Sequence, residues 1–277
     1  MTADTPNQQR STPWRWWSKL LLALTILATL ATVSFFAGPR NALGPKTAAS
    51  RPLPPVDTAL LDNWLQSGEA THSDIKPGNA KGISWQSASH QRTPWAGVYV
   101  HGFSASRLET APVTDKVAKA LGANAFHTRL TGHGPKDKRS ELINGSWGGN
   151  IAKAVQGESR GWTPDNPQED GAWTSHYPTR ALFPMMALVK GVRDSDLSTF
   201  QTPVLVLYSD QDQTVDPVET QSAFARIGAP LKSMERVSYS KSKDQHVLAG
   251  AIKDPDAVAP MVESILKWTQ SLPRQGN

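Results

Sequence analysis

The chain has 277 residues, a formal net charge of +5, 38% hydrophobic residues and 19% charged residues. These proportions are ordinary for a globular protein, so they exclude a collagen-like chain, a largely disordered chain and a disulfide scaffold. The absence of cysteine excludes thiol nucleophiles and cysteine-ligated zinc, and basic residues spread along the chain without interleaved aromatics give no reason to expect a nucleic-acid partner.

The first element is an uncharged apolar stretch at residues 20–38, which reads LLLALTILATLATVSFFAG. At ~1.5 Å per residue it would form a helix of about 28 Å, close to the ~30 Å hydrocarbon core of a bilayer. Residues 1–19 form a basic tail whose tryptophans suit the membrane interface. We expect a single-pass N-terminal membrane anchor, with a cleaved signal peptide as the alternative. Basic residues flank both ends, so the side of the membrane that holds the remaining chain stays open.

Residues 39–55 are rich in Pro, Gly and Ala and lack periodicity, which indicates a linker. Residues 56–277 suffice for one domain. Within it, strand-like apolar runs at 96–100, 123–129, 204–208 and 236–239 alternate with helical patterns at 115–121, 216–228 and 261–266. This alternation predicts an α/β fold with a mostly parallel sheet flanked by helices.

Three loops that follow predicted strands carry residues capable of chemistry. They are His101-Gly102-Phe103-Ser104, residues 209–216 and residues 243–246. Loops at the carboxyl ends of parallel strands gather at one edge of a sheet. An acid on one such loop and a histidine on a later one is the order that orients an imidazole base.

Taken together, these segments resemble a known family. The motif His101-Gly102-Phe103, the RLTGHG run at 129–134, the PVLVL strand at 203–207, Asp212 and His246 follow one another as in the α/β-hydrolase fold, in its esterase and monoacylglycerol-lipase-like branch. The resemblance implies that Asp212 is the acid of a catalytic triad, that His246 is the general base, and that the backbone N–H of Phe103 is an oxyanion donor. Asp210 and Asp216 are the alternatives to Asp212, although Asp216 is better explained as a helix cap.

The serine nucleophile of that family is not evident in this chain. The family places it on a tight turn between a buried strand and a helix, and no apolar run between residues 134 and 200 could form that strand. Ser159 lies in a literal G-x-S-x-G match, but the proline-rich residues 162–167 cannot begin a helix. Ser146 precedes a helical pattern at 150–156 but has only Leu142-Ile143 as a strand. We infer an incomplete hydrolase fold that lacks the nucleophile strand and its elbow, with residues 145–199 as a cap-like segment.

The resemblance implies a membrane-anchored serine hydrolase that acts on carboxylic esters, with a small-molecule ester or a lipid-like molecule as substrate. Without a nucleophile elbow, we expect ester hydrolysis to be absent or very weak. The alternative is a catalytically inactive module that binds an acyl ligand or a partner. No metal or organic cofactor is expected, because the seven histidines lack ligand spacing and no glycine-rich phosphate loop follows a strand.

Overall fold

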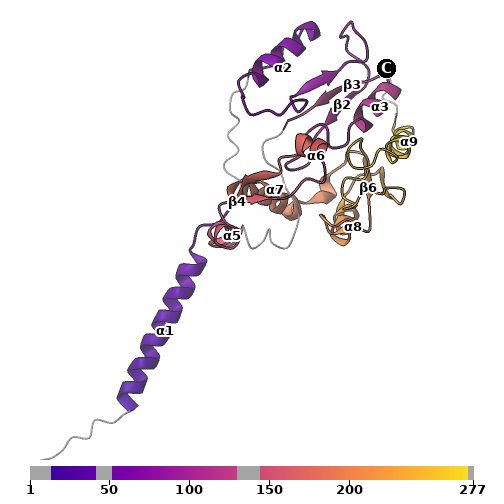
Figure 1. Cartoon of the computed structure of the whole chain (residues 1–277). Helices are drawn as coiled ribbons and strands as arrows, with labels where there is room; N and C mark the ends of the chain where they lie inside the picture. The colour runs from indigo at the N-terminus through magenta and orange to yellow at the C-terminus, as the bar shows by residue number, and fades with distance from the viewer. Residues whose placement is uncertain (1–13, 42–51, 130–143, 274–277) are drawn as a thin grey trace, which may run out of the picture.

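A long helix and a mixed α/β domain make up the structure, a computed structural model that describes residues 14–41, 52–129 and 144–273. The long helix, α1 (Trp14–Phe36), projects from the domain (Figure 1). The other helices, including short 3-10 turns marked η, are η1 (Thr58–Leu60), α2 (Leu61–Glu69), α3 (Val113–Ala120), α5 (Gly148–Gln156), α6 (Pro167–Ala172), η2 (Thr179–Ala181), α7 (Leu182–Asp194), η3 (Leu197–Thr199), α8 (Pro217–Arg226) and α9 (Val258–Thr269).

The strands are short. They are β1 (Gly82–Ser84), β2 (Ala96–Tyr99), β3 (Asn124–His127), β4 (Ser159–Gly161), β5 (His176–Pro178), β6 (Val204–Tyr208) and β7 (Lys232–Arg236).

Helix α1 meets the requirements of a membrane span by length and composition. Its segment Trp16–Phe36 has a mean hydropathy of 2.0, and none of it is buried by the rest of the protein. The helix begins at Trp14 and ends at Phe36 rather than covering residues 20–38, because a turn from Val33 to Gly38 closes its C-terminal end. A signal sequence has the same length and composition. The sequence-predicted linker lies in part outside the described residues.

The expectation of a mostly parallel sheet is wrong for the described residues, whose strands form three separate sheets. Strands β2 and β3 are parallel, and β1 adds to β3 in antiparallel direction. Strands β6 and β7 form a parallel pair, and β4 and β5 an antiparallel one. Within the described ranges no strand joins β2 to β6, so backbone pairing that would merge the two parallel pairs into one sheet is missing.

Packing of helices, rather than strand pairing, connects the two parallel pairs. Helix α3, which lies between β2 and β3 in the chain, contacts α9 near the C-terminus. Their buried side chains, Val113 from α3 and Val258 and Met261 from α9, share one apolar cluster with Val237, which directly follows β7. This cluster is therefore the main core between the two halves of the domain.

Helix α8 begins where its sequence predicts, whereas one strand lies at another position than expected. Asp216 accepts a hydrogen bond from the N–H of Val218 at 2.9 Å, and Pro217 occupies the first helical turn, as the predicted cap requires. The strand expected at 236–239 lies instead at Lys232–Arg236. Its register is set by parallel pairing with β6, a long-range contact that periodicity does not report.

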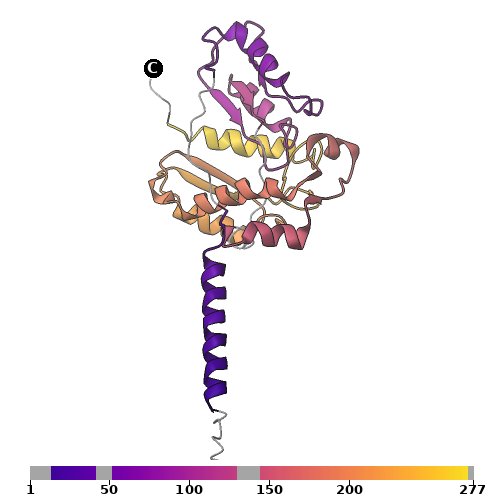
Figure 2. The same ribbon diagram turned by 90° about the vertical axis from the view of Figure 1, so that its left-hand side faces the viewer.

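The predicted cap-like segment forms a helical layer between α1 and the rest of the domain. Helices α5 and α7 share a cluster of buried residues made of Ala152, Leu182, Met185 and Met186. Figures 1 and 2 both place α5 beside the C-terminal end of α1, and in Figure 2 the α5 ribbon lies across the direction of α1.

Candidate active site

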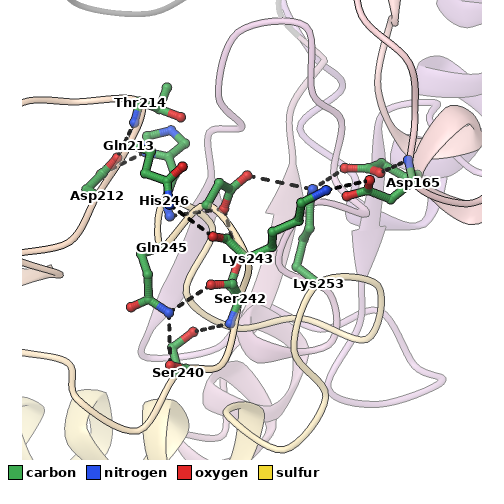
Figure 3. Close-up of polar contacts among 12 residues, drawn as sticks. Asp165, Asp212, Gln213, Thr214, Ser240, Ser242, Lys243, Gln245, His246 and Lys253 are labelled. Atoms are coloured by element: carbon green, nitrogen blue, oxygen red, sulfur yellow. Dashed lines mark hydrogen bonds and ion pairs between the residues drawn. The ribbon is translucent and has the colours of Figure 1, made fainter.

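An aspartate from the loop after β6 and a histidine from the loop after β7 meet at one edge of the sheet that these two strands form. The Nδ1 atom of His246 lies 2.9 Å from Oδ2 of Asp212, a contact visible in Figure 3. The second carboxylate oxygen of Asp212 accepts hydrogen bonds from the backbone N–H groups of Thr214, at 2.7 Å, and Val215, at 2.8 Å. Because Nδ1 is engaged with Asp212, the Nε2 atom is the nitrogen that remains to exchange a proton.

The surroundings favour the charged forms of both groups. Burial of Asp212 would raise its pKa, but the hydrogen bonds from His246 and from two backbone N–H groups hold that pKa below the ordinary value. Burial of His246 would lower its pKa, but the hydrogen bond and charge of Asp212, with the charges of Asp244 and Glu109, raise the pKa above the ordinary value. The pair is therefore arranged to stabilise an imidazolium.

The two rival acids have other partners. Asp210 forms an ion pair with Arg236, with 2.9 Å between Oδ2 and Nη1. Asp216 caps helix α8. Of the three aspartates considered from the sequence, Asp212 is thus the one in contact with the histidine.

A cavity of about 510 Å³ lies against this pair. Its lining includes Phe103 and Ser104, His246, and Trp162 and Tyr177 from the predicted cap-like segment. The loop that carries Phe103 is fixed by a buried carboxylate, because Oε2 of Glu109 accepts hydrogen bonds from the Gly102 N–H at 2.8 Å and from the Tyr99 hydroxyl at 2.9 Å. The cavity thus joins the predicted base, the predicted oxyanion loop and the cap.

Neither of the two sequence-predicted serines lines this cavity, although Arg160 and Gly161, which follow Ser159, do. Ser146 lies at the end of α1, where its hydroxyl donates to the carbonyl of Phe36 at 3.2 Å and accepts from Nε of Arg40 at 3.3 Å. Ser159 begins strand β4 and is exposed, and the next helix, α6, starts only at Pro167. Neither residue lines the cavity that His246 lines. Leu142-Ile143, considered as a strand from the sequence, and most of the RLTGHG run lie outside the described residues.

Sequence reasoning named the loop that holds Ser104 but did not single out this serine or Glu109. Ser104 is the serine on the wall of the His246 cavity, and its backbone has a φ of 57°, in the left-handed region. The sequence signal that could have identified Ser104 is its position directly after Phe103, the predicted oxyanion donor. Glu109 carried no signal in the sequence, because its role as a partner of the Gly102 N–H depends on how residues 102–109 turn back.

Charged residues connect the loop of His246 to the cap. Asp244 accepts a hydrogen bond from the backbone N–H of His246 at 3.1 Å, and its other oxygen lies 3.7 Å from Nζ of Lys253. Lys253 also forms an ion pair with Glu169 of helix α6, and Lys243 forms one with Asp165 just before that helix (Figure 3). Two ion pairs therefore hold the cap against the histidine loop.

A second cluster of serine, histidine and aspartate lies elsewhere in the domain. The Ser84 hydroxyl and the Asp115 carboxylate are both 3.1 Å from the same nitrogen, Nε2, of the buried His127. A catalytic triad needs the acid on one ring nitrogen and the serine on the other. Burial and the charge of Arg107 also hold the pKa of His127 below its ordinary value. This cluster is therefore structural.

No group of three His, Asp or Glu residues that could hold a metal ion occurs among the residues the structure describes.

Comparisons with known proteins find likenesses among solved structures. No family model matches the chain, and no curated protein matches it. Among solved structures, the chain is similar to one described under the metagenome-derived lipolytic enzymes LipS and LipT, which increase the diversity of known lipase and esterase families. The match has 19% sequence identity and a TM-score of 0.45, and covers 71% of this chain and 100% of that one.

Proposed function

We propose that the chain is a membrane-anchored protein with an esterase-type hydrolase site. In this site His246 is the general base, Asp212 orients it, and the backbone N–H of Phe103 is an oxyanion donor. The observation that carries the proposal is the 2.9 Å contact between Asp212 and His246 at the wall of a cavity that Phe103 also lines. The proposed ligand class is a carboxylic ester whose acyl part contacts Phe103, Trp162 and Val189, the apolar part of a lining that also holds charged residues such as Arg160 and Lys253.

In the proposed chemistry, Nε2 of His246 accepts the proton of the attacking hydroxyl as its oxygen bonds to the ester carbonyl carbon, and the negative charge of Asp212 stabilises the resulting imidazolium. When the bond to the alcohol oxygen breaks, the imidazolium returns this proton to the departing alcohol. The oxygen of the scissile carbonyl gains negative charge, which the N–H of Phe103 stabilises by a hydrogen bond. Both groups come from loops that follow strands, so the backbone holds them before a substrate arrives.

Turnover is expected to be absent or very weak, because neither Ser146 nor Ser159 lies on the cavity wall. A displacement of only ~1 Å can cost on the order of 10²-fold in rate. The same observation favours a second candidate function, in which the cavity binds an acyl ligand without hydrolysing it.

A fluorophosphonate probe and short acyl esters, applied to the full chain in detergent, test the proposal. Ser146→Ala, Ser159→Ala, Ser104→Ala and His246→Ala are compared with the unchanged protein. We expect little or no labelling and little hydrolysis, with any residual signal lost in His246→Ala. Strong labelling that disappears in Ser146→Ala would overturn the expectation of weak activity and establish a shortened, working triad. Activity that survives in His246→Ala would reject the proposed base.

The same protein separates the two candidate functions. Saturable binding of dodecanoate in the absence of labelling supports the ligand-binding function. Residual hydrolysis that depends on Ser104 supports a slow esterase whose hydroxyl lies on the cavity wall.

A further inference from the structure

Helix α1 is joined to the domain by direct contacts rather than by a free tether. The Trp147 backbone N–H donates to the carbonyl of Pro39 at 2.8 Å, and its indole Nε1 donates to the carbonyl of Ser34 at 3.3 Å. The side-chain amide of Asn41 donates to Oδ1 of Asn144 at 2.5 Å and to the carbonyl of Phe183 at 2.7 Å. These bonds fix the domain relative to the end of α1.

Helix α5 starts at this joint and exposes an apolar stripe. Trp147, which caps the helix, is followed at helical spacing by Ile151 and Val155, so the three side chains lie on one face. Trp147 is 39% exposed, Val155 is 78% exposed and Ile151 is half-buried. Ala152, about 100° around the helix from Ile151, is buried in the cluster that α5 shares with α7. Trp147, Ile151 and Val155 are therefore an apolar stripe outside that buried contact.

The position of this stripe indicates what covers it. The candidate membrane span ends at Phe36, so the membrane surface would lie close to this end of α1. Helix α5 lies beside that end and across the direction of α1 (Figure 2). Tryptophan is the side chain favoured at the boundary of headgroups and acyl chains. Arg40 is exposed beside this joint, where its Nε donates to the Ser146 hydroxyl at 3.3 Å, so its positive charge would lie near lipid phosphates.

We propose that α5 is an interfacial helix that rests on the bilayer, with Trp147, Ile151 and Val155 inserted at the boundary of the lipid headgroups. The occupant of this apolar face is the membrane itself. The inference rests on the proposed membrane anchor and adds a second, in-plane contact beside it.

This contact brings the cavity close to the bilayer. The buried face of α5 belongs to the same cluster as Leu182 and Met185, and Phe103 and Tyr177, which line the cavity, pack against that cluster. The same buried cluster thus contacts both the helix that carries the proposed membrane face and the residues that line the proposed site. The favoured ligand is therefore an ester dissolved in the bilayer rather than a water-soluble one.

Because the chain has no cysteine, a single introduced cysteine can carry a spin label with no native cysteine to remove first. We compare Val155→Cys on α5, Ala28→Cys inside α1, and Gln66→Cys as the control on the exposed side of α2, which Figure 1 places far from α1. The full chain is reconstituted into vesicles of equal parts phosphatidylcholine and phosphatidylglycerol. Collision of each label with apolar oxygen and with a polar nickel chelate measures its depth.

We expect the oxygen-to-nickel ratio at Val155 to be severalfold higher than at Gln66 and lower than at Ala28. A ratio at Val155 equal to that at Gln66, with Ala28 deep, would overturn the interfacial helix and leave the anchor intact. Low collision with both reagents at Val155 would show a protein partner or a second copy on this face, which also rejects the proposal. A polar environment at Ala28 would reject the anchor and the interfacial helix together.

Discussion

The contact between Asp212 and His246 couples the charge of two residues to the stability of the loops that hold them. The pKa of His246 is raised by Asp212, so its contribution to stability is full below the ordinary histidine value of ~6.5 and is lost as the pH rises through the raised value. The pKa of Asp212 is lowered, so its contribution is full above ~3.9 and is lost as the pH falls through the lowered value. The pair therefore stabilises the fold in mildly acidic solution.

The first prediction concerns the titration of this histidine. In the full chain, the imidazole of His246 should titrate above ~6.5, and Asp212→Asn should lower its midpoint, because the variant removes the carboxylate that stabilises the imidazolium. NMR of labelled histidine measures both midpoints, with His246→Gln to assign the signal. Asp210→Asn is the matched control, since Asp210 pairs with Arg236, and it should leave the midpoint unchanged. An equal shift in both aspartate variants would contradict the assignment.

At this scale the sequence predicted the residues with local signals. Asp212 follows the strand-like run at 204–208, and His246 follows the one expected at 236–239. The order of an acid and then a histidine matches the chemistry of an oriented base. Glu109 and Lys253 could not be predicted, because their partners, Gly102 and Glu169, come together only in the folded chain.

Among the elements, α6 illustrates how the cap is held. Asn166 accepts a hydrogen bond from the N–H of Glu169 at 2.8 Å, and the Glu169 carboxylate accepts from the N–H of Asp165 at 2.6 Å. Glu169 is only 1% exposed, and Lys253 is the cation that forms an ion pair with it. A buried carboxylate that loses its cation is left without compensation.

The second prediction follows from this burial. Lys253→Met should reduce the free energy of unfolding by about 3–5 kcal/mol and make the cap more sensitive to proteolysis. Lys243→Met is the matched control, because its pair with Asp165 joins side chains that are 83% and 52% exposed. Exposed pairs contribute less than about 1 kcal/mol. Urea unfolding of the full chain in detergent measures both. Similar losses of unfolding free energy in the two variants would mean that the buried pair with Glu169 contributes no more to stability than the exposed pair with Asp165.

Elements were predictable where their signals are local. The cap at Asp216 and Pro217 marked the start of α8 correctly, since capping chemistry acts within one turn. The predicted position of β7, at 236–239, was wrong, because the residues that pair with β6 are Lys232–Arg236 and not the more apolar residues that follow. The antiparallel pair of β4 and β5 was not predicted, because strands of three residues are too short to show alternation.

For the whole molecule, alternation of strands and helices predicted an α/β domain but not how its strands pair. Pairing depends on contacts between residues far apart in the chain, and the described strands form separate sheets. The exposed side chain of Val98 on β2 shows the consequence, since an additional central strand would cover this edge. Cohesion of the domain then depends on the cluster that α3 and α9 share.

The third prediction tests that dependence through Met261, a buried residue of α9 that packs with Val113 of α3 and Val237 beside β7. Met261→Ala should cost about 2–5 kcal/mol, because it removes buried methylenes and leaves a cavity. Since the cluster joins both halves, hydrogen exchange should accelerate together in β3 and in β7. Val218→Ala, at a position that is 69% exposed on α8, is the control and should change the free energy of unfolding little. Acceleration confined to β7 would show that the two halves unfold independently and that another contact holds β3.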